Sequence, residues 1–223
     1  MWDPVWDEMF SKNNWGKYPP EELVRFVARN FYKTPREDRS KVDFLDVGCG
    51  PGSCMWYLAR EGFSVTGIDG SAVALQQAEK FLASDNLSAE LTRGDIVALP
   101  YEDESFDCVI DIECLNNVTL ADARSALAEI RRVLKPKGLL FSRTFSTGTS
   151  GEGEGEHLEG EPNTYTKIKT GAFRRDKGVF RFTDETEINT LYDGFGSIEY
   201  DLMHRTDANQ SIDIREWMIT CRK

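Results

Sequence analysis

The sequence predicts an α/β fold, with helices on both faces of a mostly parallel sheet, from three observations. Short apolar runs that suit buried strands alternate with longer segments whose apolar residues recur at helical spacing. The first run, 42–47, passes directly into a glycine-rich turn, Gly48–Gly52. The second, Ser64–Asp69, ends on a carboxylate 19 positions beyond Gly50, which is the length that a loop, a helix and a strand require.

Each expected helix begins at or just after a residue that is common at helix N-termini. The helices are expected at about 21–32, 54–61, 72–82, 120–134 and 184–192. The residues at their N-termini are Pro20, Ser53, Ser71, Thr119 and Thr183. The strands are expected in apolar and β-branched runs at 42–47, 64–69, 89–92, 108–112, 139–145, 197–203 and 214–221.

The glycine turn indicates the kind of ligand. Glycines at 48, 50 and 52 lack the Cβ atoms that would keep a ligand away from the backbone. A strand that leads into such a loop and then a helix places ligands at the carboxyl edge of the sheet. The spacing does not fit the G-x-G-x-x-G dinucleotide pattern, and no P-loop lysine follows.

The stretch Asp46-Val-Gly-Cys-Gly-Pro-Gly52 resembles the first motif of the class I S-adenosylmethionine-dependent methyltransferases of the small-molecule type. The resemblance covers about 42–145. It implies a Rossmann-like three-layer α/β/α sandwich with a seven-stranded, mostly parallel sheet and an antiparallel C-terminal strand. It also implies methyl transfer from S-adenosylmethionine to a small acceptor, leaving S-adenosylhomocysteine.

The same resemblance assigns roles at the cofactor site. It implies that Asp46 fixes the glycine loop and the ammonium end, that Asp69 accepts the ribose hydroxyls, and that Asp95 takes the exocyclic amine. The complete expected set is Trp15, Asp46, Gly48, Cys49, Gly50, Asp69, Gly70, Ser71, Asp95, Ile96, Asp111 and Ile112.

No residue stands out as the catalytic base. Many small-molecule members of the family carry two histidines where this chain has Asn116 and Asn117, and asparagine can orient a substrate but cannot accept a proton near neutral pH. The candidates are Glu113, Asn116 and His157. A sulfonium is already an activated methyl donor, so we expect metal-independent transfer and no metal site.

Composition excludes several classes of partner. The chain has 223 residues and a net charge of −11, which argues against nucleic acid and anionic membranes. Its five cysteines form no C-x-x-C pair, which favours free thiols in a reducing compartment. We expect a cytoplasmic monomer or homodimer that acts on a small molecule.

The chain is expected to divide into four parts. Residues 1–41 form an aromatic and helical cover, which either packs on the domain as a leading helix or closes over the cofactor through Trp15. Residues 42–145 form the cofactor-binding core. Residues 146–182 form a loop and a small β elaboration, either a mobile surface loop or a substrate lid, with Tyr165 and Arg174 available to a polar substrate. Residues 183–223 add a helix and two strands.

Two alternatives remain open at this stage. One is a regulatory protein that binds S-adenosylmethionine but does not turn it over, which the lack of an evident base would allow. The other is a methyltransferase that acts on a protein substrate.

Overall fold

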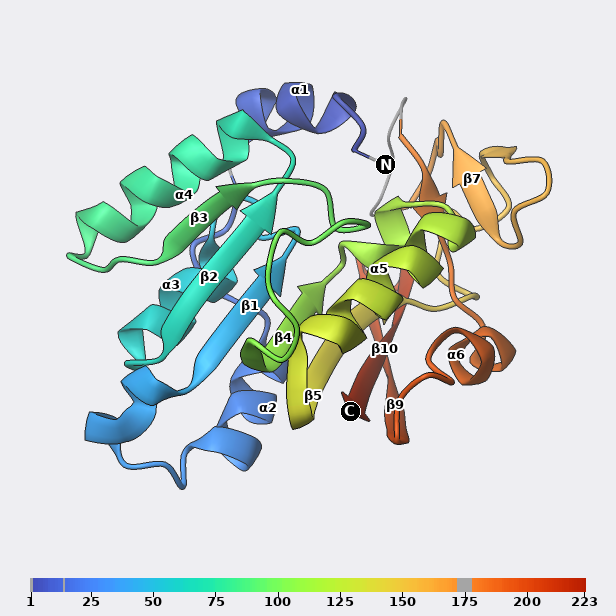
Figure 1. Ribbon diagram of the computed structural model, residues 1–223. Coiled ribbons are helices and arrows are strands. Elements are labelled where there is room, and N and C mark those ends of the chain that lie inside the picture. The colour runs from blue at the N-terminus through green and yellow to red at the C-terminus, as the bar shows by residue number, and fades with distance from the viewer. Residues whose placement is uncertain (1, 14, 172–177) are drawn as a thin grey trace.

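The computed structural model describes residues 2–13, 15–171 and 178–223. A seven-stranded sheet with the order β3-β2-β1-β4-β5-β10-β9 runs through the molecule (Figure 1). Its strands are β1 (Asp43–Val47), β2 (Ser64–Asp69), β3 (Glu90–Arg93), β4 (Phe106–Ile112), β5 (Leu134–Phe145), β9 (Ser197–Asp207) and β10 (Ile212–Arg222). The first five are parallel, and β10 is antiparallel to both of its neighbours. The predicted fold class is confirmed.

Helices cover both faces of this sheet. They are α1 (Val5–Lys12), α2 (Glu21–Phe31), α3 (Ser53–Arg60), α4 (Ala72–Ser84), α5 (Leu120–Val133) and α6 (Glu185–Leu191), with 3₁₀ turns η1 (Arg36–Lys41) and η2 (Leu115–Asn117). Successive side chains of a strand point to opposite faces. Phe44 therefore packs in the cluster with α2 and α3, while Leu45 packs in the cluster with α5 and α6.

Two of the predicted helix caps are confirmed and two are wrong. The side chains of Ser71 and Thr119 accept hydrogen bonds from the amides of Ala74 and Asp122, as expected of N-caps. Ser53, however, is the first residue of α3. Its N-cap is Gly52, whose φ of +89° suits glycine better than serine.

The last helix also begins one residue later than predicted. Asp184, and not Thr183, is the N-cap of α6, and its carboxylate accepts a 2.7 Å hydrogen bond from the Glu187 amide. Aspartate and threonine are both good caps, so sequence alone does not separate these neighbours.

A small second sheet follows β5. It has the order β6-β7-β8, formed by Glu156–His157, Thr164–Thr166 and Phe180–Arg181. A third apolar cluster joins this sheet to the ends of β5 and β10 and contains Phe145, Ile168, Phe180, Phe182 and Ile214. Arg174, predicted as a substrate contact, lies outside the described residues.

Residues 152–161, which include β6 and carry five glutamates, have partners within the fold. Glu161 accepts a 2.7 Å hydrogen bond from the Leu120 amide at the start of α5. Glu156 pairs with Lys167, and Glu152 accepts a hydrogen bond from the Gly148 amide. Three of these carboxylates are therefore used to hold the chain in place.

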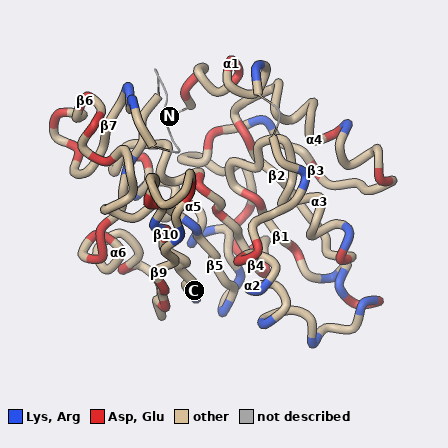
Figure 2. The backbone as a smooth tube through the Cα atoms, turned by 180° about the vertical axis from the view of Figure 1, so that it is seen from behind, with Lys and Arg blue, Asp and Glu red and all other residues tan. Residues whose placement is uncertain are grey.

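The topology fixes where a ligand can bind. From β1 the chain moves outward to β2 and β3 and then returns to β4 on the other side of β1, so the loops after β1 and β4 separate and leave a crevice. Helix α1 lies across this edge of the sheet (Figure 1). The basic residues seen around α2 and the segment before β1 gather at the opposite edge (Figure 2). No helix in the described part of the chain combines the length and the apolar character needed to cross a membrane.

Candidate functional site

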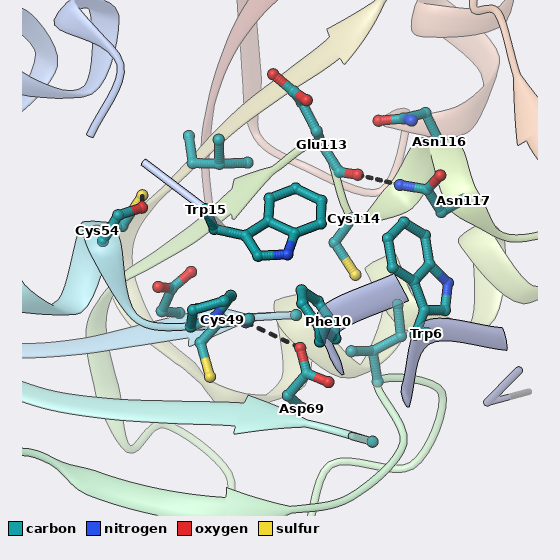
Figure 3. A pocket seen from close by; sticks show the side chains of 18 of the residues that line it. Trp6, Phe10, Trp15, Cys49, Cys54, Asp69, Glu113, Cys114, Asn116 and Asn117 are labelled. Atoms are coloured by element: carbon teal, nitrogen blue, oxygen red, sulfur yellow. Dashed lines mark hydrogen bonds between the residues drawn. The ribbon is translucent and has the colours of Figure 1, made fainter. Parts of the chain in front are cut away.

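A cavity of about 660 Å³ opens at the carboxyl ends of β1 to β4. Its volume lies within the range of about 300–1,000 Å³ that is usual for small-molecule sites. Aromatic side chains from the N-terminal segment line it: Trp2, Trp6, Phe10, Trp15 and Tyr18. Trp6, Phe10 and Trp15 are labelled in Figure 3. Of the predicted cofactor residues, all line this cavity except Ser71 and Asp111.

At Gly48 the glycine loop approaches its neighbour too closely for a side chain. Gly48 has a φ of +67°, and a methyl group at this position would collide with Cys114 Sγ. The amides of Gly48 and Cys49 both donate to the Ile68 carbonyl at the end of β2, at 2.8 and 3.1 Å. The loop therefore turns tightly around the end of β2, and the segment after β4 packs directly against it.

Asp69 holds the loop from the end of β2. One carboxylate oxygen accepts from the Gly50 amide at 2.9 Å and the other from the Ser71 amide at 2.8 Å. The residue is only 5% exposed, and burial is the main cause that raises the pKa of Asp69. Asp69 lines the cavity beneath Phe10, whose ring lies next to Gly50.

Asp46 is a buried carboxylate at the cavity floor. Within the described part of the chain its Oδ2 has no hydrogen-bond partner. Burial, together with the nearby charges of Asp69 and Asp111, raises the pKa of Asp46 well above its usual range. A positively charged ligand group beside this carboxylate would offset the cost of its ionisation.

The N-terminal segment contacts the same loops. The Trp2 amide donates a 2.8 Å hydrogen bond to Asp95 Oδ2, and the Trp2 ring lies directly on Gly70. The Ser71 hydroxyl donates to Asp7 at 2.5 Å, so Ser71 faces α1 and does not line the cavity. Trp15 lies near Phe10, with ring centroids 5.2 Å apart.

The segment after β4 supplies the other side of the cavity. Asp111 is fully buried, and it accepts hydrogen bonds from the Cys114 and Leu115 amides and from the Ser142 hydroxyl. Its carboxylate therefore holds the backbone of Cys114 and Leu115 in place. Glu113 and Asn116 line the cavity, whereas His157 lies in β6, near the ring of Tyr165, and does not.

Arg143 and Phe180 are among the lining residues that were not predicted. Arg143 is a charged residue in the apolar part of strand β5, and this unusual position is the feature of the sequence that could have identified it as a site residue. Phe180 reaches the cavity from the small second sheet, and no local pattern in the sequence indicates this position.

Comparisons with known proteins agree with this geometry. The family model described as "Methyltransferase domain" matches residues 44–138. The demethylmenaquinone methyltransferase of Tropheryma whipplei (strain Twist) is 41% identical over 105 residues, which are 47% of this chain and 42% of that one. The ubiquinone biosynthesis O-methyltransferase of Chelativorans sp. (strain BNC1) is 31% identical over 135 residues, which are 58% of this chain and 53% of that one.

Residues 44–138 thus match a methyltransferase domain, in agreement with the resemblance to the class I S-adenosylmethionine-dependent methyltransferases. The chain spans about half the length of the curated relatives it matches. A solved S-adenosylmethionine-dependent methyltransferase from Methanosarcina mazei superposes with a TM-score of 0.66 at 23% identity, covering 81% of this chain and 92% of that one, which shows a shared fold.

The methyltransferase domain fits the cofactor that its family implies. S-adenosylmethionine carries a sulfonium and an ammonium group, and the buried Asp46 oxygen without a partner suits such a cation. The loop at Gly48 and Gly50 presents bare backbone to the cavity. Asp69 and Asp95 lie where the loops after β2 and β3 reach the same cavity.

Proposed function

We propose that this protein transfers the methyl group of S-adenosylmethionine to a small-molecule acceptor, without a metal ion. The observation that carries the proposal is the buried Asp46 carboxylate beside the glycine loop of a methyltransferase domain. One relative is named as a demethylmenaquinone methyltransferase and another as a ubiquinone biosynthesis O-methyltransferase, which supports a small molecule as the acceptor.

When bound, the cofactor supplies an electrophilic methyl group on its sulfonium. The protein's part is to place the acceptor in line with that methyl group and to exclude water. We propose that Asp46 pairs with the positive charge of the cofactor, that Asp69 and Asp95 bind its nucleoside, and that aromatic faces such as that of Trp15 attract the sulfonium.

We also propose that the four parts of the chain have different roles. Residues 1–41 cover the cofactor, 42–145 bind it, and 146–182 close the acceptor side through Phe180. Residues 183–223 complete the sheet. The cytoplasmic location and the monomeric or homodimeric state stay predictions.

Binding calorimetry on wild type and on Asp46→Asn tests the role of Asp46. Loss of one charge-assisted interaction should weaken S-adenosylmethionine binding by about 10- to 150-fold. Asp43→Asn is the matched control, because Asp43 lies on the same strand but pairs with Lys135 at 3.0 Å and does not line the cavity. Equal losses in both variants would remove Asp46 from the site.

A proton readout makes this test more specific. Burial raises the pKa of Asp46, and a cation beside it would lower that pKa, so cofactor binding should release protons at a pH low enough for free Asp46 to be protonated. Calorimetry in two buffers of different ionisation enthalpy should show this release for wild type and not for Asp46→Asn.

Turnover is tested separately, by the release of S-adenosylhomocysteine in the presence of a panel of small acceptors. Binding that is tight, with no turnover on any acceptor, would favour the alternative of a non-catalytic binding protein.

A further inference from the structure

The cavity has a second polar region, distinct from the residues expected to bind the cofactor. In Figure 3 the Glu113 carboxylate and the Asn116 amide lie on the side of the cavity away from Asp69, with Cys114 and Trp15 between. Both residues come from the segment after β4, and Val118 and Phe180 add apolar surface to the same cavity.

Asn116 is the informative residue of this region. It is fully buried, and neither its Nδ2 nor its Oδ1 has a hydrogen-bond partner among the described residues. Native proteins rarely leave a buried amide with both ends unsatisfied. Because Asn116 lines the cavity, a ligand with one accepting and one donating group side by side would satisfy both atoms.

The charges of the cavity define the ligand further. Its charged lining residues in the described part of the chain are acidic except for Arg143; they are Asp3, Asp46, Asp69, Asp95 and Glu113. Arg143 is already paired, at 3.2 Å with Glu113 and at 2.6 Å with the fully buried Glu216. Among the described lining residues no uncommitted cation is left to receive an anionic acceptor, which would meet repulsion from these carboxylates, so the acceptor should not be an anion.

We propose that Asn116 anchors a non-anionic acceptor through two adjacent polar groups, such as neighbouring hydroxyls, while its apolar body packs on Phe180 and Glu113 receives its proton. This inference rests on the proposed function. In the step, the acceptor oxygen forms a bond to the methyl carbon, and the bond between that carbon and sulfur breaks. The electron pair stays on sulfur, and the hydroxyl proton passes to the Glu113 carboxylate.

The surroundings of Glu113 suit this role. Burial, together with the charges of Glu216 and Asp111, raises the pKa of Glu113 to about 7 although Arg143 acts in the other direction. A general base works best when its pKa lies near the working pH.

Asn116→Leu is the decisive variant, because leucine has a similar volume and no polar atoms to satisfy. Catechol, the simplest aromatic molecule with two adjacent hydroxyls, is the probe, and benzoate is the anionic comparison. We expect wild type saturated with S-adenosylhomocysteine to bind catechol by saturation-transfer NMR and not benzoate. Asn116→Leu should weaken catechol binding by roughly 5- to 150-fold.

The melting temperature separates a binding role from a structural one. Asn116→Leu should leave it unchanged or higher, since a buried polar group without partners is removed. The matched control is Asn117→Ala, which should lower it, because the Asn117 side chain donates a 2.5 Å hydrogen bond to the Glu113 carbonyl. A lower melting temperature for Asn116→Leu, or catechol binding equal to wild type, would overturn the inference, as would tight binding of benzoate.

These outcomes are independent of turnover. If S-adenosylhomocysteine binds and catechol binds through Asn116 but no methyl transfer occurs, the proposed catalysis fails and the acceptor site stands. If methyl transfer occurs on other acceptors while catechol neither binds nor reacts, the acceptor site fails and the proposed function stands. Glu113→Gln should abolish the rise of kcat near pH 7, and an unchanged pH profile would remove Glu113 as the base.

Discussion

The buried carboxylate of Asp111 should make the stability of this protein depend on pH. The residue is fully buried behind the segment that carries Glu113 and Asn116. Burial raises the pKa of Asp111 from 3.8 to about 6, against the lowering effects of its hydrogen bonds with Ser142, Leu115 and Cys114 and of the charge of Arg181. Since one pH unit corresponds to about 1.4 kcal/mol, keeping Asp111 ionised costs the folded state about 3 kcal/mol.

The direction of the pH dependence follows from the sign of the pKa change on folding. A carboxyl group whose pKa is higher in the folded protein than in the unfolded chain favours folding when it is protonated. Its contribution is complete below the unfolded pKa of 3.8 and is lost as the pH rises through about 6. Wild type should therefore lose about 3 kcal/mol of unfolding free energy from this group between about pH 4 and pH 7.5.

Asp111→Asn removes the titration and keeps the shape. Its Oδ1 can still accept from the Cys114 and Leu115 amides, and the new amide can donate to the Ser142 hydroxyl, which already exchanges a hydrogen bond with Tyr192 at 3.1 Å. The variant should match wild type near pH 4. At pH 7.5 it should be more stable by up to about 3 kcal/mol, or roughly 6–12 °C in melting temperature.

Thermal melting from pH 4 to 8, followed by circular dichroism, measures this difference. Asp201→Asn, at an exposed position on β9, is the control and should track wild type throughout. Parallel curves for wild type and Asp111→Asn would refute the reasoning, because they would mean that the hydrogen bonds to Asp111 compensate its burial in full.

Three further predictions concern the cofactor side of the cavity. Asp69→Ala should weaken cofactor binding by about 1.5–3 kcal/mol in calorimetry, through the loss of charge-assisted hydrogen bonds, and unchanged affinity would take Asp69 out of the site. Gly48→Ala should lower the unfolding free energy by about 1–3 kcal/mol in urea denaturation because its methyl group meets Cys114 Sγ, and the double variant with Cys114→Gly should recover part of that loss. Trp2→Ala should speed S-adenosylhomocysteine association in stopped-flow fluorescence. The reason is that the Trp2 ring lies on Gly70 and helps hold the backbone amide that donates to Asp95 Oδ2. Slower association would instead mean that the Trp2 side chain contributes to ligand binding.

Local patterns in the sequence were sufficient for the fold and for bringing the acidic residues at the strand ends to one cavity. Strand β2 spans Ser64–Asp69 as predicted, since a short apolar run between turn residues contains all the information that locates a strand. The glycines at 48, 50 and 52 all have positive φ values, which only glycine adopts readily. Asp46, Asp69 and Asp95 lie at the ends of successive parallel strands, so chain order alone brings them to one edge of the sheet.

Tertiary structure alone decided which polar residues face the cavity and which serve the fold. Asp111, within the end of β4, and Glu113, just after it, are two positions apart, yet Asp111 accepts a hydrogen bond from Ser142 while Glu113 lines the cavity beside Arg143. His157 and Phe180 both belong to the small sheet, and only Phe180 reaches the site. These outcomes depend on contacts between residues that are far apart in the chain, and the burial that sets a side chain's charge and partners exists only once those segments have packed together.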